Sequence, residues 1–135
     1  MALPAAHPAF RAHFTDPVYD DAGADDGPFG NDAGWELVTD WGDRRDGLAG
    51  GSDLRTVLGT DDVRTVVGPM EGVDGTETAQ FLVGAAFTLL RLTGWISDDD
   101  RALAVQALDF RIGAFGSTPA LVVQRDDLAS WRNPA

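Results

Sequence analysis

A group of aspartates ahead of residue 36 is the most promising set of chemical side chains in this chain. Five of them lie close together: Asp20, Asp21, Asp25, Asp26 and Asp32. Hard cations such as Ca²⁺ and Mg²⁺ take several oxygens from flexible acidic loops of this kind. Just upstream, His13 and Asp16 add a possible nitrogen and a further oxygen. These seven residues are therefore the candidate ligands of a metal site.

The aspartates do not match the calcium-loop template. If the loop starts at Asp25, Gly30 and Glu36 occupy the required sixth and twelfth positions, but Gly27 and Phe29 stand where side-chain oxygens are needed. An EF-hand is excluded on this ground. Two interpretations remain: an irregular metal site, or solvated turn residues with a helix-start charge at the end.

Other chemical motifs are missing from the chain. The two histidines, His7 and His13, have no zinc-ligand spacing, and there is no cysteine. No Gly-x-Ser-x-Gly elbow surrounds any serine, and the serines stand where helix caps or turns are expected: Ser52, Ser97, Ser117 and Ser130. The glycine-rich stretch 47–51 lacks the Lys-Ser/Thr ending and the preceding strand of a phosphate-binding loop, and the chain contains no lysine. We therefore expect no catalytic residues and no cofactor.

Tryptophan raises the question of a binding surface, since exposed aromatic side chains often anchor partners. Trp35 and Trp41 share one helix stripe and are expected in the core, and Trp95 is expected to pack in a tight turn. Trp131 lies four residues from the end of the sequence, next to Arg132. It is the best candidate for an exposed partner-binding anchor, the alternative being that it docks the last helix.

The charge balance narrows the possible partners. Of 22 acidic residues 19 are aspartate, all ten basic residues are arginine, and the formal net charge is −12 at pH 7. Such a field repels nucleic acids and anionic membrane surfaces, and it attracts basic proteins. GC-rich codons, which favour Asp, Arg, Ala and Gly, explain the same composition without any partner. The N-terminus has no secretion-signal pattern, so a cytoplasmic location is expected.

The apolar pattern predicts a mainly α protein with one domain over residues 1–135. Its strongest element is a helix over about 76–93, which is apolar on nearly all sides and ends at Gly94. A second helix over about 98–115 carries acids in its first turn and an apolar face that extends to Phe115. Because the connection is short, the two should form an antiparallel central hairpin.

The N-terminal region gives weaker signals. Residues 1–30 are expected to be irregular, with at most a short helix over 7–14 followed by a connector with turns. Residues 31–135 should form the helical body. Asn31 or Asp32 can cap its first helix, which carries the tryptophan stripe.

Three short segments remain ambiguous between helix and strand. The similar segments 52–59 and 61–68 suit two single-turn helices, although their β-branched residues also fit a strand, a turn and a strand. A last helix is expected after Thr118 and Pro119, and two valines leave residues 121–123 open in the same way.

The run Pro28-Phe29-Gly30-Asn31-Asp32-Ala33-Gly34-Trp35-Glu36-Leu37, preceded by Asp16-Pro17-Val18-Tyr19-Asp20-Asp21, resembles the signature of small uncharacterised bacterial proteins of the YfeS-like type. A second stretch, residues 85–94 with the helix start that follows, is similar to that family's second half. The resemblance implies a helical single domain from a bacterial cytosol. It implies no activity and no catalytic residues.

Two functions follow from these observations. The first is a small acidic binding or regulatory protein without enzymatic activity, which neutralises a basic partner such as a cationic nuclease toxin. The alternative is a metal-binding protein or metal-dependent enzyme that uses His13 and the carboxylates between Asp16 and Asp32. A homodimer is also possible, because the strongly apolar helix over 76–93 needs cover.

Overall fold

The computed structural model describes residues 3–48, 52–60 and 74–134. All regular elements in these ranges are helical, which confirms the prediction of a mainly α fold. The elements are α1 (Pro8–His13), the 3-10 turn η1 (Pro17–Asp20), α2 (Asp32–Asp43), the 3-10 turn η2 (Arg45–Gly47), α3 (Leu54–Leu58), α5 (Asp74–Thr93), α6 (Asp98–Phe115) and α7 (Pro119–Ser130).

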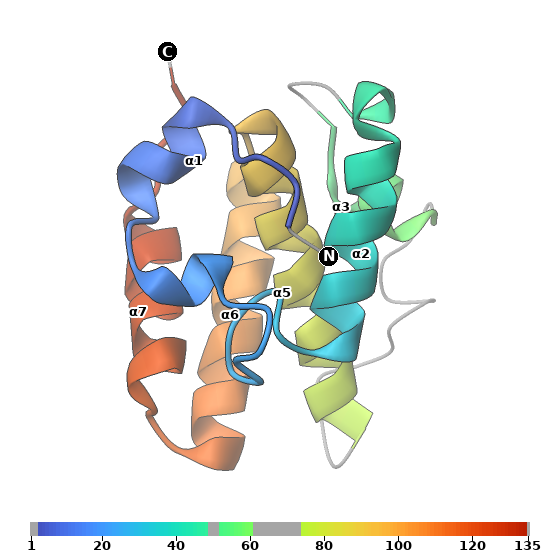
Figure 1. Ribbon diagram of the computed structural model, residues 1–135. Helices are drawn as coiled ribbons and strands as arrows, with labels where there is room; N and C mark the ends of the chain where they lie inside the picture. The colour runs from blue at the N-terminus through green and yellow to red at the C-terminus, as the bar shows by residue number, and fades with distance from the viewer. Residues whose placement is uncertain (1–2, 49–51, 61–73, 135) are drawn as a thin grey trace.

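The long helix α5 lies at the centre of the fold. It packs against α2 on one side and α6 on the other, and α6 packs in turn against α7 (Figure 1). Every residue from 82 to 92 on α5 is buried, as expected for a helix that is apolar nearly all round. The predicted hairpin of α5 and α6 is confirmed, with Gly94 at φ 70° ending the first helix and the Ser97 hydroxyl capping the second.

The segment that leads into α2 folds tightly on itself. The Asn31 Oδ1 accepts a hydrogen bond from the backbone N–H of Gly34 at 2.9 Å and so caps α2. A Cβ on Gly30 would lie 1.8 Å from the Ala24 carbonyl oxygen. A Cβ on Gly84 of α5 would lie 2.9 Å from the Gly34 Cα, so α2 and α5 cross in close contact. Neither Gly30 nor Gly84 therefore has room for a side chain.

Several local expectations are resolved by the structure. Residues 121–123 are helical, within α7, and the first of the two similar segments forms α3 with Asp53 as its cap. The second segment, 61–68, lies outside the described residues. The connector after residue 14 was expected to be irregular with turns, and it contains the 3-10 turn η1, where the Asp16 carboxylate accepts a hydrogen bond from the Val18 N–H at 2.9 Å.

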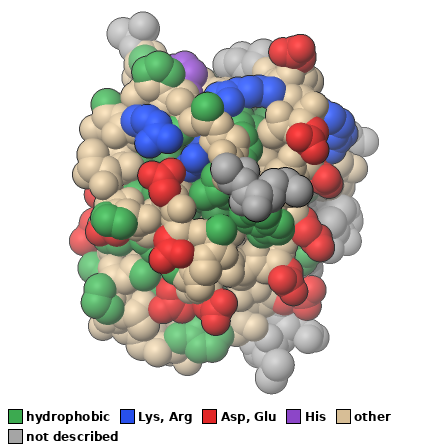
Figure 2. Space-filling model, viewed as in Figure 1, with side chains coloured by type: hydrophobic (Ala, Val, Ile, Leu, Met, Phe, Trp, Pro, Cys, Tyr) green, Lys and Arg blue, Asp and Glu red, His purple; other side chains and the backbone are tan. Residues whose placement is uncertain are grey.

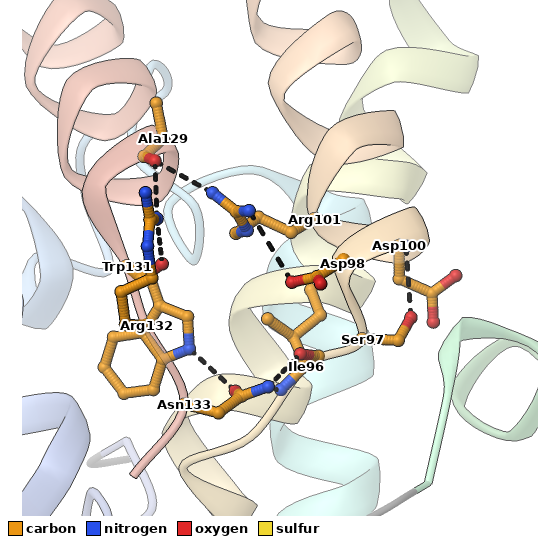
Figure 3. A network of polar contacts seen from close by, with 9 residues as sticks. All are labelled: Ile96, Ser97, Asp98, Asp100, Arg101, Ala129, Trp131, Arg132 and Asn133. Atoms are coloured by element: carbon orange, nitrogen blue, oxygen red, sulfur yellow. Dashed lines mark hydrogen bonds and ion pairs between the residues drawn. The ribbon is translucent and has the colours of Figure 1, made fainter. Parts of the chain in front are cut away.

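The C-terminal segment folds back onto the core, which corrects the prediction for Trp131. Its side chain is 3% exposed and stacks on Phe14 with ring centroids 5.4 Å apart, so it is not an exposed anchor. Figure 3 shows how Asn133 fastens this segment. The Asn133 amide accepts from the Ile96 N–H and the Trp131 indole N–H, at 3.0 and 2.9 Å, and donates to the Ile96 carbonyl at 2.6 Å.

Candidate functional site

His13 lies apart from the aspartates with which the sequence had grouped it. Its Nε2 is 2.7 Å from the carbonyl oxygen of Asp127 and 3.2 Å from the hydroxyl of Ser130, both on α7. A carbonyl oxygen only accepts, so Nε2 must carry the proton and donate it to Asp127. This nitrogen therefore cannot take a proton from Ser130. The serine–histidine contact, which sequence reasoning missed, docks α1 onto α7 and does not form a catalytic pair.

Three of the predicted metal ligands have structural roles of their own. Asp16 caps η1, and the Asp21 carboxylate accepts from the Gly23 N–H at 2.8 Å within a turn. Asp20 forms ion pairs with Arg91 at 3.1 Å and with Arg11 at 3.7 Å. Among the residues that the structure describes, no group of three or more His, Asp or Glu side chains is placed to hold a metal ion.

Arg91 is a buried arginine that donates three hydrogen bonds to other parts of the fold. Its side chain is 2% exposed, and its Nε donates to the Pro4 carbonyl at 2.7 Å. Its Nη1 donates to the Tyr19 carbonyl and to the Asp20 carboxylate, both at 3.1 Å. Burial lowers the pKa of Arg91, and the Asp20 carboxylate acts in the opposite direction. This arginine ties the N-terminal segment to α5.

The remaining three aspartates surround a pocket of about 440 Å³ between the loop before α2 and helices α5 and α6. We call it the Arg111 pocket. It is lined by Asp25, Asp26, Gly30, Asn31, Asp32, Gln80, Arg111 and Phe115.

Arg111 is as deeply buried as Arg91 but is not satisfied. It is 2% exposed, and its Nε and Nη1 have no hydrogen-bond partner in the part of the chain that the structure describes. Burial lowers the pKa of Arg111, while the charge of Asp26 acts in the opposite direction without forming an ion pair. A buried charged group without hydrogen bonds destabilises the fold that holds it. Such a group in a pocket is a candidate ligand-binding residue.

The acidic side of the pocket is built on a well-anchored loop. The fully buried Gln124 of α7 donates from Nε2 to the Asp26 carbonyl, and the Asn31 Nδ2 donates to the Gly27 carbonyl at 3.2 Å. These bonds hold the backbone from which the aspartates project. The carboxylates are therefore presented by a fixed backbone.

The rim of the Arg111 pocket combines charge with an exposed aromatic ring. Asp25 and Asp32 are exposed and Asp26 is half-buried, and none of the three forms an ion pair with a described residue. Phe115 is 57% exposed, the only large hydrophobic side chain so exposed in the described ranges, although the sequence predicted it on the apolar face. Figure 2 shows acidic side chains over the middle and lower part of the face crossed by residues 17–31, with basic side chains nearer the top.

A signal for Arg111 exists in the sequence. On α6 the buried positions Ala104, Ala107 and Leu108 follow helical spacing, and Arg111 occupies the next position on that face. A charged side chain at a core-facing position of a helix is rare, so it indicates either a buried ion pair or a functional site.

Comparisons of the chain with protein-family models, with curated proteins and with solved structures found no match. No helix in the described ranges is long and apolar enough to cross a membrane.

Proposed function

We propose that this protein is a non-enzymatic binding protein that recognises a basic protein through the rim of the Arg111 pocket. One observation carries the proposal: three carboxylates that form no ion pair with any residue the structure describes, Asp25, Asp26 and Asp32, line one pocket with the exposed ring of Phe115. Interfaces combine such an aromatic anchor with charges complementary to those of the partner. One form of this function is the inhibition of a cationic nuclease, whose phosphate-binding surface an aspartate-rich face can occupy.

The net charge of −12 supports the same proposal, because it should speed the association with a basic partner. Opposite charge steers a basic partner toward the protein and raises the association rate, and this gain falls as salt screens it. The metal-dependent alternative receives no support from the described residues. His13 donates a hydrogen bond to α7. Asp16 and Asp21 accept hydrogen bonds from nearby backbone N–H groups, and Asp20 pairs with an arginine of α5. Membership of the YfeS-like group stays a proposal that adds no activity.

Two triple variants with the same change of net charge test the proposal. In the first, Asp25, Asp26 and Asp32 become Asn; in the second, Asp40, Asp43 and Asp46 become Asn, at the other end of α2 and in η2. Wild-type protein on a column should retain a basic protein from the extract of its source cells at low salt and release it at high salt. The retained protein is then identified, purified and titrated with each variant.

The pocket variant should lose most of its affinity for that partner, and the control variant should keep most of it. Equal losses would show that only the overall charge matters and would contradict a role for this site. Retention of no basic protein by the wild type would contradict the proposed function itself.

A further inference from the structure

We propose that the Arg111 pocket binds a carboxylate that is joined to a cationic group, as in a basic α-amino acid or the C-terminal residue of a basic chain. The inference deepens the proposed function and rests on it in one respect, namely that this pocket is the binding site. It names the chemical class of the group that enters.

The anionic half of the ligand is required by Arg111. Its Nε and Nη1 have no partner among the described residues, although the side chain is 2% exposed and lines the pocket. A guanidinium presents its N–H groups in a planar fork that fits the two oxygens of a carboxylate. Nε–H and the Nη1–H groups lie on different edges of the guanidinium, so one carboxylate would supply an acceptor to one of the two nitrogens together with the missing negative charge. Arg91, with three hydrogen bonds, shows how this fold satisfies a buried arginine when the role is structural.

The cationic half of the ligand is required by the aspartates. A simple anion that approached Arg111 would pass Asp25, Asp26 and Asp32, and the whole protein carries a net charge of −12. Repulsion therefore disfavours phosphate, sulfate and dicarboxylates. A ligand with its own ammonium or guanidinium group can pair with these carboxylates while its carboxylate reaches Arg111.

The pocket has room for one amino acid residue, and its lining suits a basic side chain. A volume of about 440 Å³ lies within the range of roughly 300–1,000 Å³ typical of small-molecule sites. At the rim, the exposed Phe115 offers an aromatic surface for the aliphatic stem or the guanidinium of a basic side chain. L-Arginine and L-lysine are the simplest molecules that satisfy all three requirements.

Four probes of matched side chain separate the roles of the ligand's groups in calorimetric titrations. They are L-arginine, argininamide with its carboxylate capped, agmatine without a carboxylate, and Nα-acetyl-L-arginine with its amino group capped. Argininamide and agmatine should bind at least about tenfold more weakly than L-arginine, since a charge-assisted hydrogen bond is lost. Because both keep the cationic side chain, they also control for general attraction to an acidic protein.

Nα-acetyl-L-arginine distinguishes the two sources of the ligand. Binding as tight as that of L-arginine identifies the C-terminal residue of a chain, whose amino group is an amide. Loss of binding on acetylation identifies the free amino acid. Either result supports the inference.

Arg111→Met should bind L-arginine and argininamide equally weakly, whereas Arg44→Met, which removes an exposed arginine near the other end of α2, should keep the wild-type preference. Equal binding of L-arginine and argininamide to the wild type, unchanged binding to Arg111→Met, or no binding of any probe would overturn the inference. None of these results decides the proposed function, which depends on the partner titrations with the aspartate variants.

Discussion

Arg91→Met and Arg111→Met, which each remove a buried arginine, should change the free energy of unfolding in opposite directions. Arg91 and Arg111 are both 2% exposed, on neighbouring helices of the same hairpin. Arg91 donates three hydrogen bonds, whereas Nε and Nη1 of Arg111 have no partner among the described residues. Methionine is unbranched and apolar, so it can fill much of the same space without a charge. We therefore expect Arg91→Met to destabilise the protein and Arg111→Met to stabilise it.

The magnitudes follow from the two environments. Each unsatisfied buried polar group costs about 1–3 kcal/mol. Arg111→Met removes two such atoms but also the attraction to Asp26, so it should raise the free energy of unfolding by about 2 kcal/mol. Arg91→Met leaves the carbonyls of Pro4 and Tyr19 without donors and should lower that free energy by about 3 kcal/mol. For a chain of this length these changes move Tm by roughly 6–10 °C upward and 10–15 °C downward.

Urea denaturation followed by tryptophan fluorescence measures both changes, and thermal melts without ligand check them. The purified protein must first be dialysed, because a bound ligand would stabilise the wild type and hide the cost of Arg111. If Arg111→Met instead lowers the free energy of unfolding by more than about 1 kcal/mol, Arg111 is already satisfied within the fold and the expected stabilisation is wrong.

Three further predictions concern the elements that support the site. Asn133→Ala should lower the free energy of unfolding by about 2–3 kcal/mol in urea denaturation, because the Ile96 backbone and the Trp131 indole lose their partner. Asn133→Asp keeps the acceptor for the two N–H groups but places a carboxylate oxygen against the Ile96 carbonyl oxygen, so it should also destabilise the protein. Gly84→Ala should destabilise the protein by about 1–3 kcal/mol, because the new Cβ meets Gly34. Gly113→Ala, where a Cβ meets open space, should stabilise the protein by roughly 0.5–1 kcal/mol. Equal effects of the two substitutions in thermal melts would contradict the close crossing of α2 and α5. Hydrogen bonds from the Arg55 side chain and the Thr56 N–H lower the pKa of Asp53. The ionised Asp53 carboxylate therefore stabilises the fold at pH values above the ordinary pKa of an aspartate. The stability difference between wild type and Asp53→Asn, measured by urea titration at several pH values, should therefore shrink as the pH falls below about 4, and a constant difference would show that charge is not involved.

Much of the helical framework could be predicted because it depends on local chemistry. The α5–α6 hairpin follows from a continuous apolar stretch, a glycine that adopts a positive φ at its end and a serine cap at the next start. The cap of α2 by Asn31 is equally local. The burial of Trp131 could not be predicted in this way, because it depends on Asn133 pairing with Ile96, 37 residues away in the chain.

The candidate site was predictable only in part for the same reason. Asp25, Asp26 and Asp32 lie within one short stretch, so their proximity was visible in the sequence. Arg111 comes about 80 residues later, and only the packing of α6 beside the loop brings it to them. His13 was grouped with the aspartates because it is near them in sequence, but its ring packs against Trp131, with centroids 5.3 Å apart.

Nuclear magnetic resonance can show whether the Arg111 guanidinium binds a carboxylate in the acidic pocket. The Nε–H group of Arg111 gives its own signal in ¹⁵N-labelled protein, and Arg111→Met identifies that signal by its loss. Titration with L-arginine should shift it, together with the backbone amides of residues 25–32, and argininamide should leave it nearly unmoved. An Arg111 signal that stays in place while L-arginine shifts residues elsewhere, or shifts none, would contradict such binding.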